Sequence, residues 1–171
     1  MEQLLLHLNA AYNLAFWITR NSHDAEDVVQ EAYLRAVKFF GSFKGRDMRA
    51  WLLTIVRNTS YTWLRDNRAS QSTVDFDEEK HSTECEEVNP ETILIRSVDH
   101  QLLRQAVEEL PVWLREVVIL REMEGMSYKE IAHVADIPVG TVMSRLARAR
   151  KRLQTVLTQA TEQTESTCPL S

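Results

Sequence analysis

Glycine and proline are scarce in this chain, and that scarcity constrains its fold more than any other feature. Four glycines and four prolines occur among 171 residues, so few positions can supply the tight turns that join the strands of a sheet. Apolar residues recur instead at helical spacing over most of the chain. In residues 48–68 they are Trp51, Leu52, Ile55, Val56, Thr59, Trp63 and Leu64. The sequence therefore predicts an all-α protein.

A short acidic segment divides the chain into two helical blocks. The formal net charge is −5, but residues 70–92 alone hold eight acids and one lysine, a net of −7. This segment is polar, lacks helical periodicity and contains Pro90. We interpret it as a flexible linker between two small helical domains, residues 1–69 and 93–157, and expect residues 158–171 to be a disordered tail.

Each block divides into a small number of helices. In the first block we expect helices over residues 2–20, 23–40 and 48–68, with a loop at 41–47. The first of these carries apolar residues at helical spacing: Leu5, Leu8, Tyr12, Ala15, Phe16 and Ile18. In the second block we expect helices over 93–110, 111–125, 128–135 and 139–153, the third opened by a capping box of Ser127 and Glu130.

Several classes of protein fit the sequence poorly. No apolar run approaches the roughly 20 residues that span a bilayer, and the N-terminus lacks a signal-peptide pattern, so we expect a cytoplasmic protein without membrane insertion. The two cysteines, Cys85 and Cys168, lie in polar segments and suit a reducing compartment. His81 and Cys85 have no second ligand pair, and no phosphate loop or nucleophile elbow occurs, so we predict neither metal, cofactor nor catalysis.

The last predicted helices have the pattern of a helix-turn-helix. In residues 139–153 an apolar stripe is formed by Val142, Leu146, Ala149 and Leu153. Another face carries Thr141, Ser144, Arg145, Arg148, Lys151 and Arg152, while Arg150 lies apart. The preceding helix buries Ile131 with Ala132 or Ala135, and the second would enter the major groove. The alternative is a solvated basic face on a bundle helix; the cap, turn and basic face at this spacing favour DNA binding.

Both blocks resemble one protein family. The motifs DAEDVVQE, FKG and WLLTIVRNT in the first block, and EELPVWLREVVILREMEGMSYKEIA with IPVGTVMSRLARAR in the second, are similar to those of bacterial sigma factors of the extracytoplasmic-function class. The similarity covers residues 10–155. It implies a transcription initiation factor that binds core RNA polymerase and recognises two promoter elements, serves stress or envelope responses, and is held by an anti-sigma protein.

The resemblance also implies which residues contact DNA. For the -35 element they are Gly140, Thr141, Ser144, Arg145, Arg148, Lys151 and Arg152. Relatives often have Lys or Arg where this chain has Met143, so any base contact there must be apolar. For the -10 element they are Phe43, Lys44, Arg46, Arg57, Asn58 and Arg65, with Asn58 the best single candidate to read an unstacked base. The alternative for Asn58 is a plain helix-surface residue; Trp51 and Trp63 are read as core residues rather than stacking platforms.

Two further roles follow from the resemblance. An acidic and amide face would dock on the clamp helices of the large polymerase subunit: Asp24, Glu26, Asp27, Gln30 and Glu31. These acids also favour a helix N-terminus, whatever else they do. The acidic linker would thread a basic polymerase channel, or would act only as a spacer. A stand-alone helix-turn-helix regulator is the alternative function, and it would need a ligand or phosphoacceptor domain in place of the docking motif.

Overall fold

The structure is a computed structural model that describes residues 2–45, 47–71 and 100–165. Within these ranges the chain forms helices joined by turns, and no strand occurs. The all-α prediction is therefore confirmed. Most of the acidic linker, with His81 and Cys85, and also Arg46 and Cys168, lies outside the described residues.

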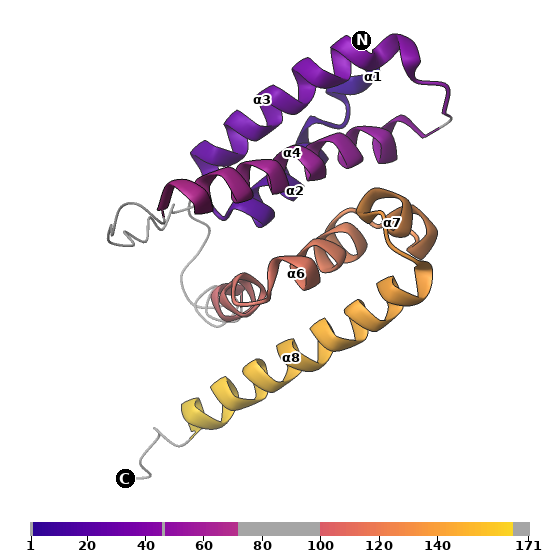
Figure 1. Ribbon diagram of the computed structural model, residues 1–171. Helices are drawn as coiled ribbons and strands as arrows, with labels where there is room; N and C mark the ends of the chain where they lie inside the picture. The colour runs from indigo at the N-terminus through magenta and orange to yellow at the C-terminus, as the bar shows by residue number, and fades with distance from the viewer. Residues whose placement is uncertain (1, 46, 72–99, 166–171) are drawn as a thin grey trace, which may run out of the picture.

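The N-terminal half is a bundle of three main helices (Figure 1). These are α2 (Leu8–Thr19), α3 (Ser22–Phe39) and α4 (Met48–Gln71), preceded by the short α1 (Glu2–Leu5). A short 3-10 helix, η1 (Phe40–Ser42), follows α3 and leads into the loop before α4. The third helix thus runs two residues past the predicted end of its domain.

The expected single helix over residues 2–20 is wrong, because the chain turns at Leu6 and His7. The turn folds α1 back so that Leu4 is buried and its carbonyl accepts a 2.6 Å hydrogen bond from the Tyr33 hydroxyl. The expected apolar face is shifted as a result. Leu5 and Leu8 are exposed, and the core takes Leu4, Ala11 and Leu14 instead, whereas the predicted Ala15 and Ile18 are buried as expected.

The core of the N-terminal half is centred on α4. Leu52, Leu53 and Val56 are fully buried. Trp51 and Trp63 are half-buried and pack against this core, which favours the core interpretation of both tryptophans.

The C-terminal half contains the remaining helices. Residues 100–108 are helical, followed by α6 (Val112–Val118), the π-helical turn η2 (Ile119–Met123), α7 (Tyr128–Ala135) and α8 (Val139–Glu165). Gly125 ends the α6–η2 segment in the left-handed conformation, with φ +64°, which a residue without Cβ adopts readily. Residues 93–99 of the predicted 93–110 helix lie outside the described residues.

The expectation of a disordered tail from residue 158 is wrong for residues 158–165, which continue α8. The physical reason is visible in the sequence, because no glycine or proline occurs between Gly140 and Pro169 to end the helix.

The predicted capping box opens α7. The Ser127 hydroxyl accepts from the Glu130 backbone N–H at 3.3 Å, and the Glu130 carboxylate accepts from the Ser127 N–H at 2.6 Å. These bonds hold the pKa of Glu130 below its ordinary value.

Because an N-cap hydroxyl contributes about 1 kcal/mol, we expect Ser127→Ala to lower the free energy of unfolding by that amount in urea titrations. Thr155→Ala, which removes an exposed hydroxyl from α8, should lower the free energy of unfolding much less; equal losses would contradict the capping role.

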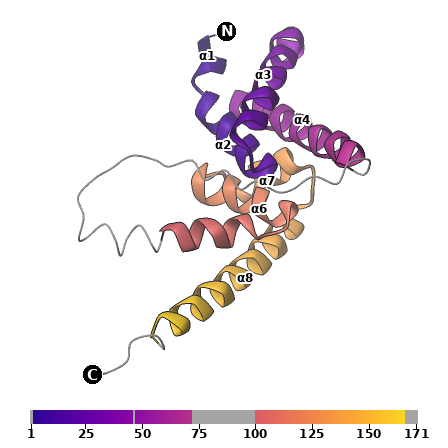
Figure 2. The same ribbon diagram turned by 90° about the vertical axis from the view of Figure 1, so that its left-hand side faces the viewer.

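The two halves pack against each other through α2 with α6 and α4 with α7. In both views the N-terminal helices lie on one side of α6 and α7, and α8 lies on the other (Figures 1 and 2). Sequence reasoning predicted the two domains but not this interface.

Candidate nucleic-acid interface

The segment α7–turn–α8 has helix-turn-helix geometry. Helix α7 ends at Asp136 in the left-handed conformation, and α8 begins at Val139. The predicted inner stripe of α8 is confirmed, because Val142, Leu146 and Ala149 are buried and Leu153 is half-buried against the same core. On α7 the buried partner of Ile131 is Ala135, whereas Ala132 is half-buried.

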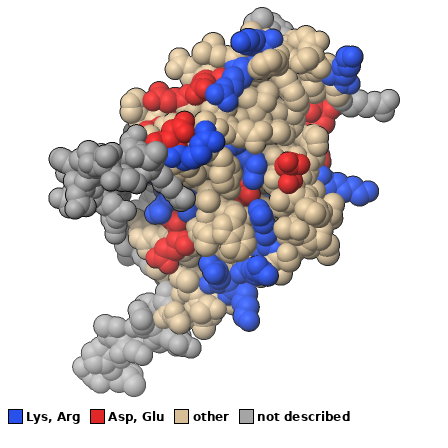
Figure 3. Space-filling model, viewed as in Figure 1, with Lys and Arg blue, Asp and Glu red and all other residues tan. Residues whose placement is uncertain are grey.

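The outer face of α8 is exposed and basic. Five of the seven residues predicted to contact the -35 element are exposed there: Gly140, Ser144, Arg148, Lys151 and Arg152. Lysine and arginine side chains gather over α8 in the lower half of Figure 3. Met143 is 53% exposed between them, so an apolar contact is open to it. Thr141 is half-buried at the helix start, and its carbonyl accepts a 3.0 Å hydrogen bond from the Ser144 hydroxyl.

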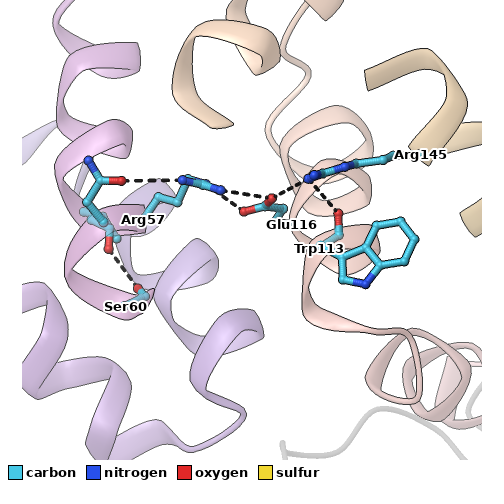
Figure 4. Close-up of polar contacts among 7 residues, drawn as sticks. Arg57, Ser60, Trp113, Glu116 and Arg145 are labelled. Atoms are coloured by element: carbon cyan, nitrogen blue, oxygen red, sulfur yellow. Dashed lines mark hydrogen bonds and ion pairs between the residues drawn. The ribbon is translucent and has the colours of Figure 1, made fainter. Parts of the chain in front are cut away.

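Arg145 is held apart from this exposed set. Its guanidinium lies 5.5 Å from the ring centre of Trp113 and donates to the Trp113 carbonyl at 3.4 Å. It also donates to the Glu116 carboxylate at 3.1 Å (Figure 4). Arg145 is thus bound inside the C-terminal half in this conformation, and its predicted DNA contact stays a prediction.

The loop before α4 holds the first residues predicted for the -10 element. Phe43 is half-buried, with its ring 4.9 Å from that of Trp51, and Lys44 is exposed. A Cβ on Gly45 would come within 2.9 Å of the Phe43 ring, so a glycine keeps this loop tight. A groove of about 430 Å³ lies between this loop, the first turn of α4 and helix α7. Helix α7 contributes Lys129 and His133 to its wall.

The remaining -10 candidates lie along α4 in different environments. Asn58 is exposed, and its side-chain oxygen accepts a 3.5 Å hydrogen bond from Arg57. Arg65 is exposed and pairs with Asp66 at 3.2 Å. Arg57 is turned toward the C-terminal half, where it donates to Glu116 at 2.8 and 3.3 Å. The structure therefore does not place Arg57 and Asn58 on one free surface.

The predicted docking face lies on α3. Asn21 caps this helix by accepting from the His23 and Asp24 backbone N–H groups at 2.9 and 3.1 Å. Glu26, Asp27, Gln30 and Glu31 are exposed. Asp24 is half-buried, and burial together with the charge of Asp27 raises the pKa of its carboxyl group despite the nearby His23.

Sequence reasoning missed an apolar continuation of this face. Leu34 and Val37, one and two turns beyond Gln30, are 69% and 46% exposed. Exposed apolar residues next to polar ones are typical of protein–protein interfaces. The signal was present in the sequence, because Leu34 and Val37 fall outside the buried stripe of Ala25, Val28, Val29, Ala32 and Ala36.

Each half of the chain matches a known protein family. Residues 5–70 match Sigma-70 region 2, and residues 100–153 match Sigma-70 region 4. The ECF RNA polymerase sigma-E factor of Escherichia coli K12 is 39% identical over 139 residues, which cover 77% of this chain and 73% of that protein. The chain is a sigma factor of the extracytoplasmic-function class. The RNA polymerase sigma-H factor of Pseudomonas aeruginosa is also similar, at 37% identity over 91% of this chain and 88% of that one.

Solved structures agree with this assignment. The sigma factor RpoE from Bartonella quintana, in complex with the anti-sigma factor NepR, is 31% identical with a TM-score of 0.73, covering 92% of this chain and 95% of that one. CnrH, in complex with the cytosolic domain of CnrY, is 26% identical with a TM-score of 0.63, covering 92% and 87%.

The family assignment decides between the functions considered. A sigma factor directs RNA polymerase to promoters and is generally not an enzyme, and the presence of region 2 disfavours a stand-alone regulator. No helix in the described part of this sigma factor is long and apolar enough to cross a bilayer. Among the same residues, no group of three or more His, Cys, Asp or Glu side chains could hold a metal ion.

Proposed function

We propose that this sigma factor docks on core RNA polymerase through α3, reads the -35 element with α8 and holds the opened -10 element with α4 and the loop before it. The observation that carries the proposal is the exposed basic face of α8 in a chain that also contains region 2. The acidic segment that follows α4 joins the two halves, either as a spacer or by following a basic channel of the polymerase.

The chemistry of α8 suits duplex DNA. Arg148, Lys151 and Arg152 follow one another along its exposed face, where they can neutralise phosphates. Gly140 at the start of α8 is exposed and has open space around it, so backbone N–H groups can approach a phosphate closely. Thr141, Ser144 and Met143 would then face base edges.

The chemistry of region 2 suits an unpaired strand. The side chains proposed for it are Phe43, Lys44, Arg46, Arg57, Asn58 and Arg65. An exposed amide on Asn58 can read a base edge, and the exposed Lys44 and Arg65 can hold the backbone. The groove beside Phe43 and Lys44 offers space for a base that has left the stack.

The docking face combines charge with apolar surface. Asp27, Gln30 and Glu31 would meet basic residues of the polymerase clamp helices, and the exposed Leu34 and Val37 would bury against them. We further propose that an anti-sigma protein binds this chain in the cytoplasm and releases it under stress of the cell envelope. The Bartonella quintana neighbour, solved with an anti-sigma factor, supports that partner class.

The phosphate role of α8 can be tested by salt dependence. Arg148→Ala is expected to weaken duplex promoter binding and to lower the slope of log K against log salt by about 0.9 per lost contact. Arg150→Ala is the matched control, because Arg150 lies off the basic face and pairs with Glu122 at 3.0 Å. Fluorescence anisotropy at several salt concentrations measures both; equal slopes in wild type and Arg148→Ala would remove Arg148 from the DNA interface.

The function as a whole is tested by transcription. Core polymerase, the purified chain and a promoter library should yield run-off transcripts that are absent without the chain. Duplex binding by the chain alone, with no transcript from any library, would instead support a stand-alone regulator.

A further inference from the structure

We propose that this sigma factor selects a thymine in the -35 element by packing an apolar ridge of α8 against the C5-methyl group of that base. The apolar ridge consists of Val139, Met143 and Ala147. The inference rests on the function proposed above, because it assumes that α8 lies in the major groove of the promoter. It adds base selection to that function, since the cations of α8 can bind the phosphates of any sequence.

The apolar ridge is one of two rows of side chains along the exposed surface of α8. Residues four positions apart lie on one side of a helix, so Val139, Met143 and Ala147 follow one another from turn to turn. The neighbouring row starts one position later and carries small, polar and basic residues: Gly140, Ser144, Arg148 and Arg152. All members of both rows are exposed. A groove that receives the basic residues therefore also meets the apolar ridge.

The apolar ridge leaves hydrophobic surface uncovered. Val139 and Met143 are 37% and 53% exposed, and neither side chain belongs to the hydrophobic core. The packing of α8 does not require them, because Val142, Leu146 and Ala149 already form its buried stripe. Removing apolar surface from water is favourable, so a ligand that places an apolar group against the ridge gains affinity from it.

Met143 is the side chain of the ridge that is best placed to reach a base. In a helix-turn-helix the first residues of the second helix contact base edges, and the first two turns of α8 span residues 139–145. Arg145 in this stretch is bound to Glu116 at 3.1 Å. Met143 is therefore the longest exposed side chain of these two turns.

Small residues beside Met143 allow the backbone of α8 to approach the base pairs. Gly140 lies one turn before it, and a Cβ at that position would have open space around it. Ala147 lies one turn after it and ends at its Cβ. The Ser144 hydroxyl donates to the Thr141 carbonyl at 3.0 Å, so this side chain folds back on the helix. The flexible thioether of Met143 can therefore extend past its neighbours to the floor of a groove.

Thymine offers the group that such a side chain can recognise. Its C5-methyl is the apolar group among the base edges of the major groove, whereas the other groups there are hydrogen-bond donors and acceptors. A thioether pairs poorly with those groups, since its sulfur is only a weak acceptor. The apolar ridge therefore favours a T·A pair, in either orientation, over a G·C pair.

A protein partner is the alternative occupant of an exposed apolar surface, but two observations favour DNA. Stable protein interfaces bury about 800 Å² on each side, whereas the apolar ridge has three side chains, of which Ala147 is a single methyl group. The neighbouring row carries Arg148 and Arg152, and such cations suit the phosphates that flank a base contact.

The first experiment identifies the base pair with the holoenzyme. Core polymerase and the chain transcribe a promoter library in which every randomised -35 element is linked to a barcode in the transcript. We expect the wild-type chain to select a T·A pair at a -35 position, and Met143→Arg to replace that preference with G·C, because arginine pairs with guanine O6 and N7. Met123→Arg is the matched control, because Met123 is 51% exposed but lies in η2, outside α8; it should keep the wild-type selection.

The second experiment removes the methyl group alone. Deoxyuridine replaces the selected thymine, and fluorescence anisotropy measures the affinity of the holoenzyme for the labelled promoter. Wild type should bind the deoxyuridine promoter about three- to fivefold more weakly, the effect expected for one buried methyl group. Met143→Ala should bind both promoters nearly equally, and Met123→Ala should retain the wild-type ratio.

Equal affinity of the wild-type holoenzyme for the two promoters would overturn the inference, and so would an unchanged ratio in Met143→Ala or an unchanged selection in Met143→Arg. The affinity of each variant for core polymerase is measured in parallel. A loss of that affinity in Met143→Arg would assign the apolar ridge to a protein interface and would also overturn the inference. If the wild-type chain yields no transcript from the library, the proposed function fails instead.

Discussion

Reversing the charge of the α3 face should weaken binding to core RNA polymerase by about 100-fold or more. In Asp27→Arg with Gln30→Arg, two exposed positions of the proposed docking face become cationic. Like charges brought together in an interface cost several kcal/mol, and each 1.4 kcal/mol is about a factor of ten in affinity. The exposed Leu34 and Val37 lie on the same helix. When charge repulsion keeps α3 away from the polymerase, their proposed apolar contact with it is lost as well.

The measurement is surface plasmon resonance with immobilised core polymerase. Glu109→Arg reverses an exposed charge in the C-terminal half and should leave the affinity within about twofold of wild type, since isolated surface charges contribute little. A similar loss in Glu109→Arg would mean that net charge, rather than the α3 face, governs binding. Wild-type affinity in the double variant would place the polymerase elsewhere on the chain.

Local sequence patterns predicted the parts of this fold that local forces determine. The capping box at Ser127 and Glu130 depends on residues three apart, and the buried stripe Val142, Leu146 and Ala149 depends on the helical period. The family motifs then connected these elements to promoter recognition. Where a local pattern was ambiguous the prediction failed, as at Leu5 and Leu8, because a turn at Leu6 and His7 changes which side of the chain faces the core.

Contacts between residues far apart in sequence could not be predicted in this way. Arg57 and Glu116 are separated by 59 positions, and Arg49 and Glu124 by 75. Nothing in the residues around an arginine indicates whether it faces solvent or a buried carboxylate. Sequence reasoning therefore assigned Arg57, Arg145 and Arg148 alike to DNA, whereas the structure leaves Arg148 exposed and binds the other two to Glu116.

This difference matters for interpreting substitutions. Arg57→Ala would remove a proposed DNA contact and also leave the buried Glu116 with one partner fewer, so its effects on promoter opening and on folding stability would be mixed. Asn58 offers a cleaner probe of the -10 element, because it is exposed and its side chain meets the protein through one long hydrogen bond, 3.5 Å from Arg57.

Asn58→Ala is expected to spare polymerase binding and to reduce open-complex formation by roughly tenfold or more. A side-chain amide that pairs with a base edge is worth about 1–3 kcal/mol, and in this step the contact stabilises the opened state rather than the duplex. Permanganate reactivity of unpaired thymines, measured with the reconstituted holoenzyme, reports the opened fraction.

Asn9→Ala provides the matched control, since it makes the same truncation at an exposed position of α2 that has no proposed DNA contact. Its permanganate signal should equal that of wild type. A full signal in Asn58→Ala would leave Asn58 as a plain surface residue of α4 and shift base recognition to the loop of Phe43 and Lys44. A loss in both variants would point to weakened folding, because the two amides lie on different helices and share no proposed ligand.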